Sequence, residues 1–180
     1  MTIAILGWGS LIPCPGDLSI MGGWHLDGPV LKIEFSRKSA DGRLTLVIDT
    51  GRGTEVTTQF AESTCADLNA AIENLRHREG TAARNIGVCS RDATETSNHP
   101  QVLPSIREWL TRSRFDAVIW TDLGSNFAPD RNRKELLDEA FSYLESLSTV
   151  CKANARNYIN TAPPQTQTEL RLYLQSKGWL

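Results

Sequence analysis

The chain lacks three features that define large classes of proteins. No uninterrupted apolar run is long enough to span a bilayer. A formal net charge of -2 over 180 residues gives no basic surface for nucleic acid. The opening residues have neither the charged region nor the cleavage pattern of a signal peptide. We therefore expect a cytoplasmic protein that binds neither membranes nor nucleic acid.

Cysteine and histidine are also scarce, with four and three residues. The cysteines, Cys14, Cys65, Cys89 and Cys151, are far apart and form no C-x-x-C pair. This spacing indicates neither a zinc site nor a disulfide framework, and it predicts reduced, mostly buried thiols. A catalytic cysteine with a histidine base is an alternative, but no local signature supports it.

The most informative segment that is present is an apolar strand followed by a glycine-rich turn. Residues 2–6 form the expected strand, and Gly7-Trp8-Gly9-Ser10-Leu11 follows directly. Two glycines permit close backbone approach and positive φ, and consecutive N–H groups after a buried strand can form a concave site for an anion. The structural alternative is that Gly7 and Gly9 only let the end of the strand pack tightly.

A dinucleotide-binding loop is excluded by the residues that follow. Gly7-Trp8-Gly9 begins as such a loop does, but Ile12 stands at the third glycine position. Pro13 and Pro15 then occupy the place where a helix is required. No Gly-Lys-Ser/Thr sequence follows either, so a phosphate-binding loop of the Walker type is not predicted.

Strand patterns dominate the next part of the chain. The β-branched and apolar segments 30–36 and 44–49 are joined by an Asp-Gly turn within 39–42, a strong hairpin signal. A third strand is expected over 54–60, after the turn at 51–53. We expect three antiparallel strands in a meander beside the first strand, with residues 13–28 as a long loop.

An amphipathic helix is predicted over residues 66–78. Leu68, Ala71, Ile72 and Leu75 fall on one face. Ser63 or Thr64 is available as the N-cap, and Gly80 is placed to end the helix as its C-terminal cap. The cluster Arg76-His77-Arg78 is interpreted as solvated helix surface.

Glu79 is the candidate catalytic residue. It lies at the carboxyl end of the predicted helix, where backbone carbonyls disfavour a negative charge and so favour a group that takes up and releases a proton. The alternative is that Glu79 is an ordinary solvated residue at the end of a charged face. Arg37, near the end of a strand, either pairs with a substrate carboxylate or lies on the surface of a hairpin.

The second half reads as mainly helical. Helices are expected over 104–112, 131–147, 151–158 and from the capping box 166–169 to Gly178, with a buried strand at 116–120. The loop 121–129 carries Asp122, Ser125 and Asn126, which either reach a cavity or form a turn.

The order of these motifs resembles the gamma-glutamylcyclotransferase-like family. The family has a Tyr-Gly-Ser-Leu turn after its first strand, where this chain has Trp8-Gly9-Ser10-Leu11. Phe35-Ser36 and the segment 42–47 match its next strands, and 75–80 matches its Leu-Asp-x-x-Glu-Gly helix end. The resemblance covers roughly the first ninety residues, and each motif alone is weak. Trp8 departs from the family tyrosine.

The resemblance implies a fold and a division of the chain. The fold is α+β, a small mixed β-barrel with an added C-terminal helical layer. The whole chain, 1–180, is expected to form one domain. Residues 1–103 would supply the barrel core and the Glu79 helix, and 104–180 a helix-rich extension packed on it.

The resemblance also implies an activity. Enzymes of the family release 5-oxoproline and an amine from a gamma-glutamyl compound, without metal or cofactor. Carried over, Glu79 would be the general acid and base, and the loop Gly7–Leu11 would hold the substrate. The alternatives are a small-molecule-binding module without catalysis and a protein-interaction module whose partner docks on the helical half.

Overall fold

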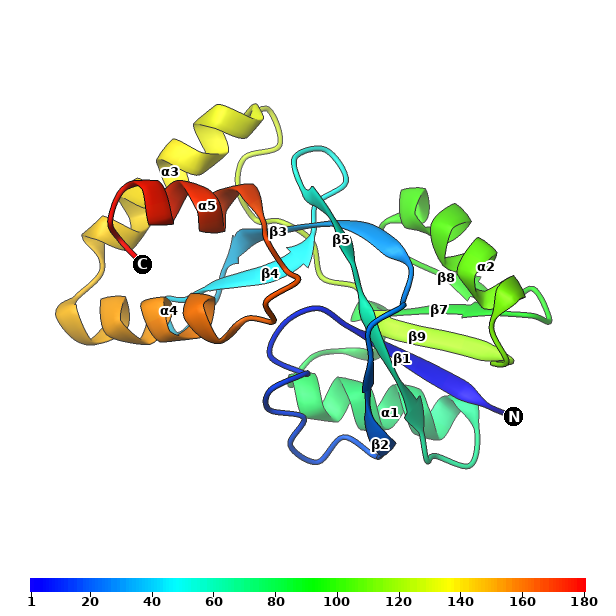
Figure 1. Cartoon of the computed structure of the whole chain (residues 1–180). Coiled ribbons are helices and arrows are strands. Elements are labelled where there is room, and N and C mark those ends of the chain that lie inside the picture. Colours follow the sequence, from blue (N-terminus) through cyan, green and yellow to red (C-terminus); the bar gives the residue numbers. More distant parts are fainter.

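The computed structural model describes all residues, 1–180, and contains two β-sheets flanked by helices (Figure 1). The larger sheet has the order β2 (Ile20–His25), β6 (Gln59–Ser63), β1 (Ile3–Gly7), β9 (Ala117–Thr121), β7 (Ile86–Ser90), β8 (Glu95–Thr96). The smaller has the order β4 (Leu44–Ile48), β3 (Val30–Lys38), β5 (Thr54–Thr57). The protein is α+β, but its strands form two sheets with free edges and no closed barrel.

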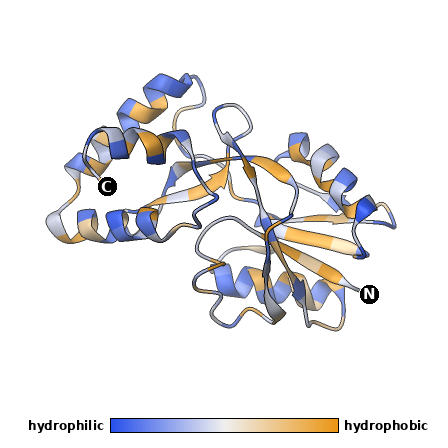
Figure 2. Ribbon diagram, in the orientation of Figure 1, coloured by the Kyte–Doolittle hydropathy of each residue, from blue (hydrophilic) through white to orange (hydrophobic).

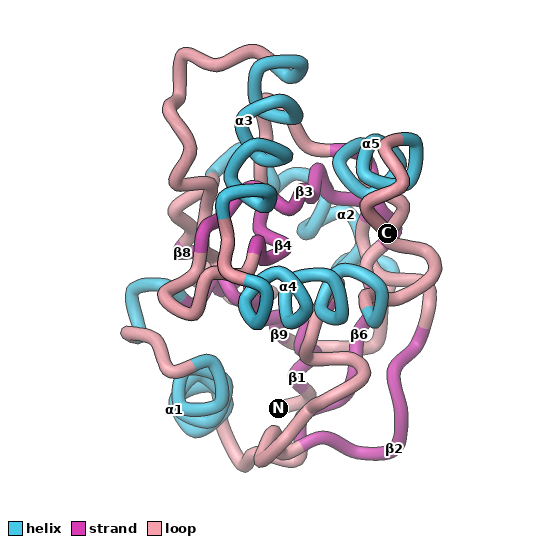
Figure 3. Tube along the Cα trace, turned by 90° about the vertical axis from the view of Figure 1, so that its left-hand side faces the viewer, coloured by secondary structure: helices cyan, strands magenta, loops and turns pink.

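The helices fall into two groups. Helices α1 (Leu68–Glu79) and α2 (Leu103–Arg112) accompany the larger sheet, and α3 (Arg133–Ser146), α4 (Thr149–Thr161) and α5 (Glu169–Ser176) lie beside the smaller one (Figures 1 and 3). Short 3-10 turns at Ala83–Asn85 and Pro100–Val102 precede β7 and α2. None of these helices has the length and apolar character needed to cross a membrane.

Strands β1 and β9 are the parallel pair at the centre of the larger sheet. Successive side chains of β1 point to opposite faces, with Ile3 and Ile5 in the apolar cluster under α1 and Ala4 and Leu6 in the main core. Because both faces are covered, the strand is apolar without interruption, as Figure 2 shows.

Helix α1 forms where the apolar spacing predicts it. Ala71 and Leu75 are fully buried against the sheet. Gly80 ends the helix with a left-handed φ of 61°, which confirms the predicted C-cap. The expected N-cap is wrong: Asp67, not Ser63 or Thr64, accepts a hydrogen bond from the Ala70 amide. Ser63 lies in β6 instead.

The predicted meander is corrected by the pairing of the strands. The hairpin β3–β4 forms as expected, but β3 lies in the middle of the small sheet and pairs with both β4 and β5. The first strand belongs to the other sheet. The segment 54–60 divides at Thr58, whose amide and hydroxyl both donate to the Pro29 carbonyl. There the chain passes from one sheet to the other.

Two further expectations change. The loop 13–28 contains the edge strand β2, which pairs with β6. The second half is not only a helical extension, since β9 lies at the centre of the larger sheet, so no layer boundary falls between residues 103 and 104. All four cysteines are free, as expected, but Cys89 alone is buried.

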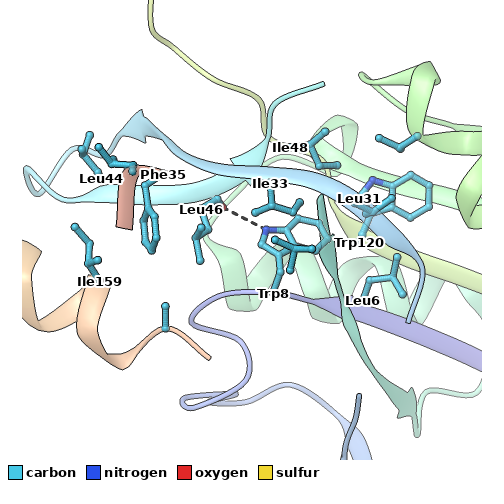
Figure 4. Close-up of a cluster of buried hydrophobic side chains, with 14 of the residues drawn as sticks. Leu6, Trp8, Leu31, Ile33, Phe35, Leu44, Leu46, Ile48, Trp120 and Ile159 are labelled. Carbon is cyan, nitrogen blue, oxygen red and sulfur yellow. Dashed lines mark hydrogen bonds between the residues drawn. The ribbon is translucent and has the colours of Figure 1, made fainter. Parts of the chain in front are cut away.

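The small sheet and the C-terminal helices share one core with the inner face of the larger sheet (Figure 4). Trp8 lies in this core, and its indole Nε1 donates to the Leu46 carbonyl of β4 at 3.4 Å. Ile159 of α4 packs into the same cluster. The loop Gly7–Leu11, which we call the first loop, is therefore fixed against both the hairpin and the C-terminal helices.

Candidate functional site

A cavity of about 260 Å³ lies where the first loop, the end of α1 and the β3–β4 hairpin meet. We call it the inner cavity. Its lining includes the predicted catalytic residue Glu79 and every predicted substrate-binding residue, namely Gly7, Trp8, Gly9, Ser10, Leu11 and Arg37. Further lining residues are Leu6, Ser39, Arg43, Thr45, Leu46, Val47, Arg78, Thr121, Leu123 and Tyr158. The site lies beyond the carboxyl ends of the parallel strands β1 and β9, a common position for ligands in α/β sheets.

The first loop supplies hydrogen-bond donors to this cavity. The backbone amides of Trp8, Gly9 and Ser10 donate to no other group of the chain, although Trp8 and Gly9 are buried. Buried amides are almost always paired, so donors left free along a cavity wall are suited to hold an anion or a carbonyl oxygen.

The two glycines of the loop differ in whether the structure requires a glycine at that position. A Cβ at Gly7 would lie 2.6 Å from Cζ3 of Trp24, so Gly7 is required for packing. A Cβ at Gly9 would lie 3.5 Å from Cδ1 of Leu46 and 3.6 Å from the Tyr158 hydroxyl oxygen, both ordinary contacts. Neither glycine has a positive φ, so that part of the expectation is wrong. Leu11 belongs to the apolar cluster under α1.

Glu79 is the last residue of α1, and its side chain is 17% exposed. Its carboxylate forms an ion pair with the guanidinium of the preceding Arg78. Arg78 also donates to the backbone carbonyls of Ser10 at 3.2 Å and Pro15 at 3.3 Å, and to that of Cys14. The interpretation of Arg78 as solvated surface is therefore wrong. It connects the end of α1 to the first loop. No sequence pattern near Arg78 predicts this contact.

Arg37 reaches the cavity from β3. Its Nη1 donates to the Gly124 carbonyl at 3.0 Å, which fixes one side of the guanidinium and leaves its other donors for a ligand. In the loop after β9, Thr121 and Leu123 line the cavity, and the Thr121 hydroxyl is buried without a hydrogen-bond partner in the protein.

The polar residues named for that loop have structural partners instead. Asp122 accepts from the Trp120 indole at 2.9 Å and from the Asn98 amide. The Ser125 hydroxyl donates to the Ser36 carbonyl at 2.8 Å. The Asn126 amide group donates to the Lys38 carbonyl at 2.9 Å, and its oxygen accepts from the Lys38 amide at 2.8 Å. These contacts fit the alternative in which the loop is a turn.

A second, wider cavity of about 540 Å³ adjoins the first, and we call it the outer cavity. The two cavities share Gly9, Ser10, Arg43, Arg78 and Tyr158 as lining residues. The outer cavity is also lined by the polar residues Asp41, Asn154, Asn157 and Thr161 and by Pro13, Cys14 and Ala162. The shared residues form the junction between the cavities.

Two side chains at this junction were not singled out by the sequence. Arg43 pairs with Asp41 at 2.6 Å and lowers the pKa of that carboxyl to about 2. The Arg43 Nε is buried without a hydrogen-bond partner. Tyr158 comes from α4. The only sequence signal for it is the helical period of 149–161, because Tyr158 follows Asn154 by four residues and so lies on the same polar face of the helix.

No three His, Cys, Asp or Glu side chains are grouped so that they could hold a metal ion. Comparison with known proteins finds no family model, no curated protein and no solved structure that matches the chain. The family resemblance therefore depends on the sequence motifs alone.

Proposed function

We propose that the chain is a gamma-glutamylcyclotransferase-like enzyme, which releases 5-oxoproline and an amine from a gamma-glutamyl compound. The observation that carries the proposal is that Glu79 lines the same cavity as Trp8, Gly9 and Ser10, whose backbone amides have no hydrogen-bond partner within the chain. A carboxylate near a row of backbone donors is the arrangement that proton transfer and oxyanion stabilisation require.

The proposed reaction takes place within one substrate molecule. The substrate's α-amine attacks its own γ-carbonyl carbon, so a C–N bond forms and closes a five-membered ring. The carbonyl oxygen gains negative charge, which the amides of the first loop stabilise. The bond to the original amide nitrogen then breaks and the amine leaves. Atoms and electrons balance without water, oxidant or metal.

Glu79 moves the proton in this scheme. The nitrogen that attacks becomes positively charged and must lose a proton, and the nitrogen that leaves must gain one. A carboxylate between them can accept the first proton and deliver the second. The Arg78 ion pair must open or shift for this transfer, since it engages the same carboxylate. Holding the substrate in a folded conformation supplies much of the remaining rate.

Arg37 is assigned to substrate binding. A guanidinium fixed on one side by the Gly124 carbonyl presents its remaining donors in a rigid arrangement. That geometry matches a carboxylate, which the glutamyl group carries next to its amine. The Ser10 hydroxyl, from the first loop, adds a further donor.

The test is the release of 5-oxoproline from a panel of gamma-glutamyl amino acids, peptides and amines. We expect turnover of at least one compound, and a loss of about 100-fold or more in Glu79→Gln. Glu73→Gln is the matched control, because Glu73 lies on the same helix in an exposed ion pair with Arg76. Full activity of Glu79→Gln, or no turnover with any compound, contradicts the proposal.

The Arg78 ion pair favours a second candidate, a binding module on the same cavity. A carboxylate that stays paired does not accept a proton, whereas the free amides can still bind a carboxylate ligand. This candidate predicts that 5-oxoproline raises the melting temperature of the protein while no compound of the panel is turned over.

A further inference from the structure

Helix α4 presents a polar face to the site. Asn154, Asn157, Tyr158 and Thr161 all line the outer cavity, and their spacing of three and four residues places them on one side of the helix. The opposite side is apolar, with Ala155 and Ile159 fully buried in the main core. The helix is therefore packed by one face and lines a cavity with the other.

Tyr158 is the only member of this face that also lines the inner cavity. Its ring is held on two sides. Phe35 packs edge-on with ring centroids 6.2 Å apart, and the Arg43 guanidinium lies 4.9 Å from the ring centroid. These contacts direct the hydroxyl towards the first loop, where a Cβ at Gly9 would lie 3.6 Å from it.

The phenol is a proton donor at neutral pH. Burial raises the pKa of Tyr158 above its ordinary value of 10, and the negative charge of Glu79 acts in the same direction. Three interactions lower the pKa of Tyr158 and so oppose this increase: hydrogen bonds with the Leu46 backbone and the Ser10 side chain, and the positive charge of Arg43. Glu79 and Tyr158 line the same inner cavity, although they lie on α1 and α4.

The rest of the C-terminal layer holds α4 in this place. The buried guanidinium of Arg171 donates to the carbonyls of Asn160, Pro163 and Thr166, which close the end of α4 and the turn after it. The Thr166 hydroxyl donates to the Trp8 carbonyl at 3.0 Å. The segment that follows α4 is thus bonded both to α5 and to the first loop.

We propose that Tyr158 contacts the substrate, its hydroxyl donating a hydrogen bond to the amide that joins the glutamyl group to the departing amine. This inference rests on the proposed function. The inner cavity, with Glu79 and the first loop, takes the glutamyl part, and the outer cavity, which the polar face of α4 lines, takes the amine. The scissile amide then lies at the junction, where the Tyr158 hydroxyl is. The C-terminal helical layer is therefore part of the site.

The test compares Tyr158→Phe with the wild-type protein. Phenylalanine keeps the ring that packs on Phe35 and Arg43, so the melting temperature should not change. We expect kcat for 5-oxoproline release to fall by about 10- to 100-fold with a smaller change in KM, as for loss of one donor to the reacting group. Tyr173→Phe is the matched control, because that hydroxyl bonds Asp138 on the surface and lines neither cavity.

The outcomes separate this inference from the proposed function. If the wild type is active and Tyr158→Phe keeps its kcat, the contact is overturned and the proposed function stands. If no compound is turned over, binding of the intact gamma-glutamyl compounds of the panel, which keep the amide that Tyr158 is proposed to contact, is measured by calorimetry. Weaker binding by Tyr158→Phe then supports the contact although catalysis has failed. Equal binding by both proteins, or none by either, overturns it.

Discussion

The hydroxyl of Thr166 donates a hydrogen bond of 3.0 Å to the backbone carbonyl of Trp8, joining the start of the chain to the segment before its last helix. Thr166 is 1% exposed, so no water replaces this bond. Trp8 is at the same time tied to β4 through its indole. The loop that supplies the free amides is therefore held from two directions by residues remote in sequence.

Thr166→Val tests this connection. Valine has nearly the same shape but leaves the Trp8 carbonyl buried without a donor, so we expect a loss of about 1–2 kcal/mol in the free energy of unfolding. Because the loop loses one of its supports, 5-oxoproline release should also fall. Urea unfolding and a turnover assay measure the two effects.

Thr111→Val is the matched control for that experiment. The Thr111 hydroxyl bonds the Arg107 carbonyl within α2 on the protein surface, where water can replace it. We expect a change of less than about 0.5 kcal/mol there. Equal stability losses in the two variants would contradict the assigned role of Thr166.

Gly7→Ala and Gly9→Ala separate packing from cavity formation in the first loop. At Gly7 the new methyl group would meet Trp24 at 2.6 Å and 2.8 Å, and the indole must move. We expect Gly7→Ala to cost about 1–3 kcal/mol, as overpacking does. Gly9→Ala adds a methyl group at ordinary contact distance, so its unfolding free energy should change by less than about 0.5 kcal/mol.

Thermal and urea unfolding of both variants give the comparison. Shortening the side chain that obstructs the methyl group, as in the double variant Gly7→Ala, Trp24→Leu, should recover part of the loss, because the effects of contacting residues are not additive. A stable Gly7→Ala protein, or a destabilised Gly9→Ala protein, would reverse the roles given to the two glycines.

The local parts of this structure are predictable from the sequence, and the long-range parts are not. Helix α1 and the β3–β4 hairpin follow from apolar spacing and an Asp-Gly turn, which act between near neighbours. The edge strand β2 carries Gly22 and Gly23 and shows no strand pattern, since its pairing with β6 alone holds it. The strand order of the small sheet likewise depends on a long-range contact, the pairing of β5 with β3.

The residues of the site also differ in whether local sequence patterns predict them. Glu79 and the first loop carry recognisable motifs, because their roles depend on a helix end and a strand end. Arg78 and Tyr158 carry none. Arg78 becomes part of the site only because the segment after Ser10 folds back over it. Tyr158 reaches the cavity only because α4 packs beside the hairpin. Contacts between remote segments decide both placements.

A buried carboxyl away from the site makes stability depend on pH. Glu34 of β3 is 1% exposed, and burial raises its pKa from 4.5 to about 7. Hydrogen bonds from the Phe35 amide at 2.8 Å and the Leu170 amide at 3.3 Å, together with the Thr168 side chain, oppose the shift, and the charge of Glu169 adds to it. Glu34 thus faces the first turn of α5.

The direction of the pH dependence follows from whether the folded or the unfolded state binds the Glu34 proton more tightly. Between about pH 4.5 and 7 the folded state keeps the proton on Glu34 while the unfolded state has lost it, so the free energy of unfolding falls as pH rises. Below pH 4.5 this contribution is fully present, and above pH 7 it is lost. The shift corresponds to roughly 3 kcal/mol over that range.

Glu34→Gln should remove this part of the pH dependence. Glutamine stays neutral and keeps one acceptor oxygen for the amides of Phe35 and Leu170. We therefore expect the variant to be more stable than the wild type at pH 8, relative to pH 5, by about 2–3 kcal/mol in urea unfolding. Glu55→Gln, at an exposed position of β5, should follow the wild-type slope. Parallel curves for wild type and Glu34→Gln would mean that the Glu34 carboxyl ionises in the folded protein much as it does in the unfolded chain. The contact between β3 and α5 would then contribute equally at both pH values.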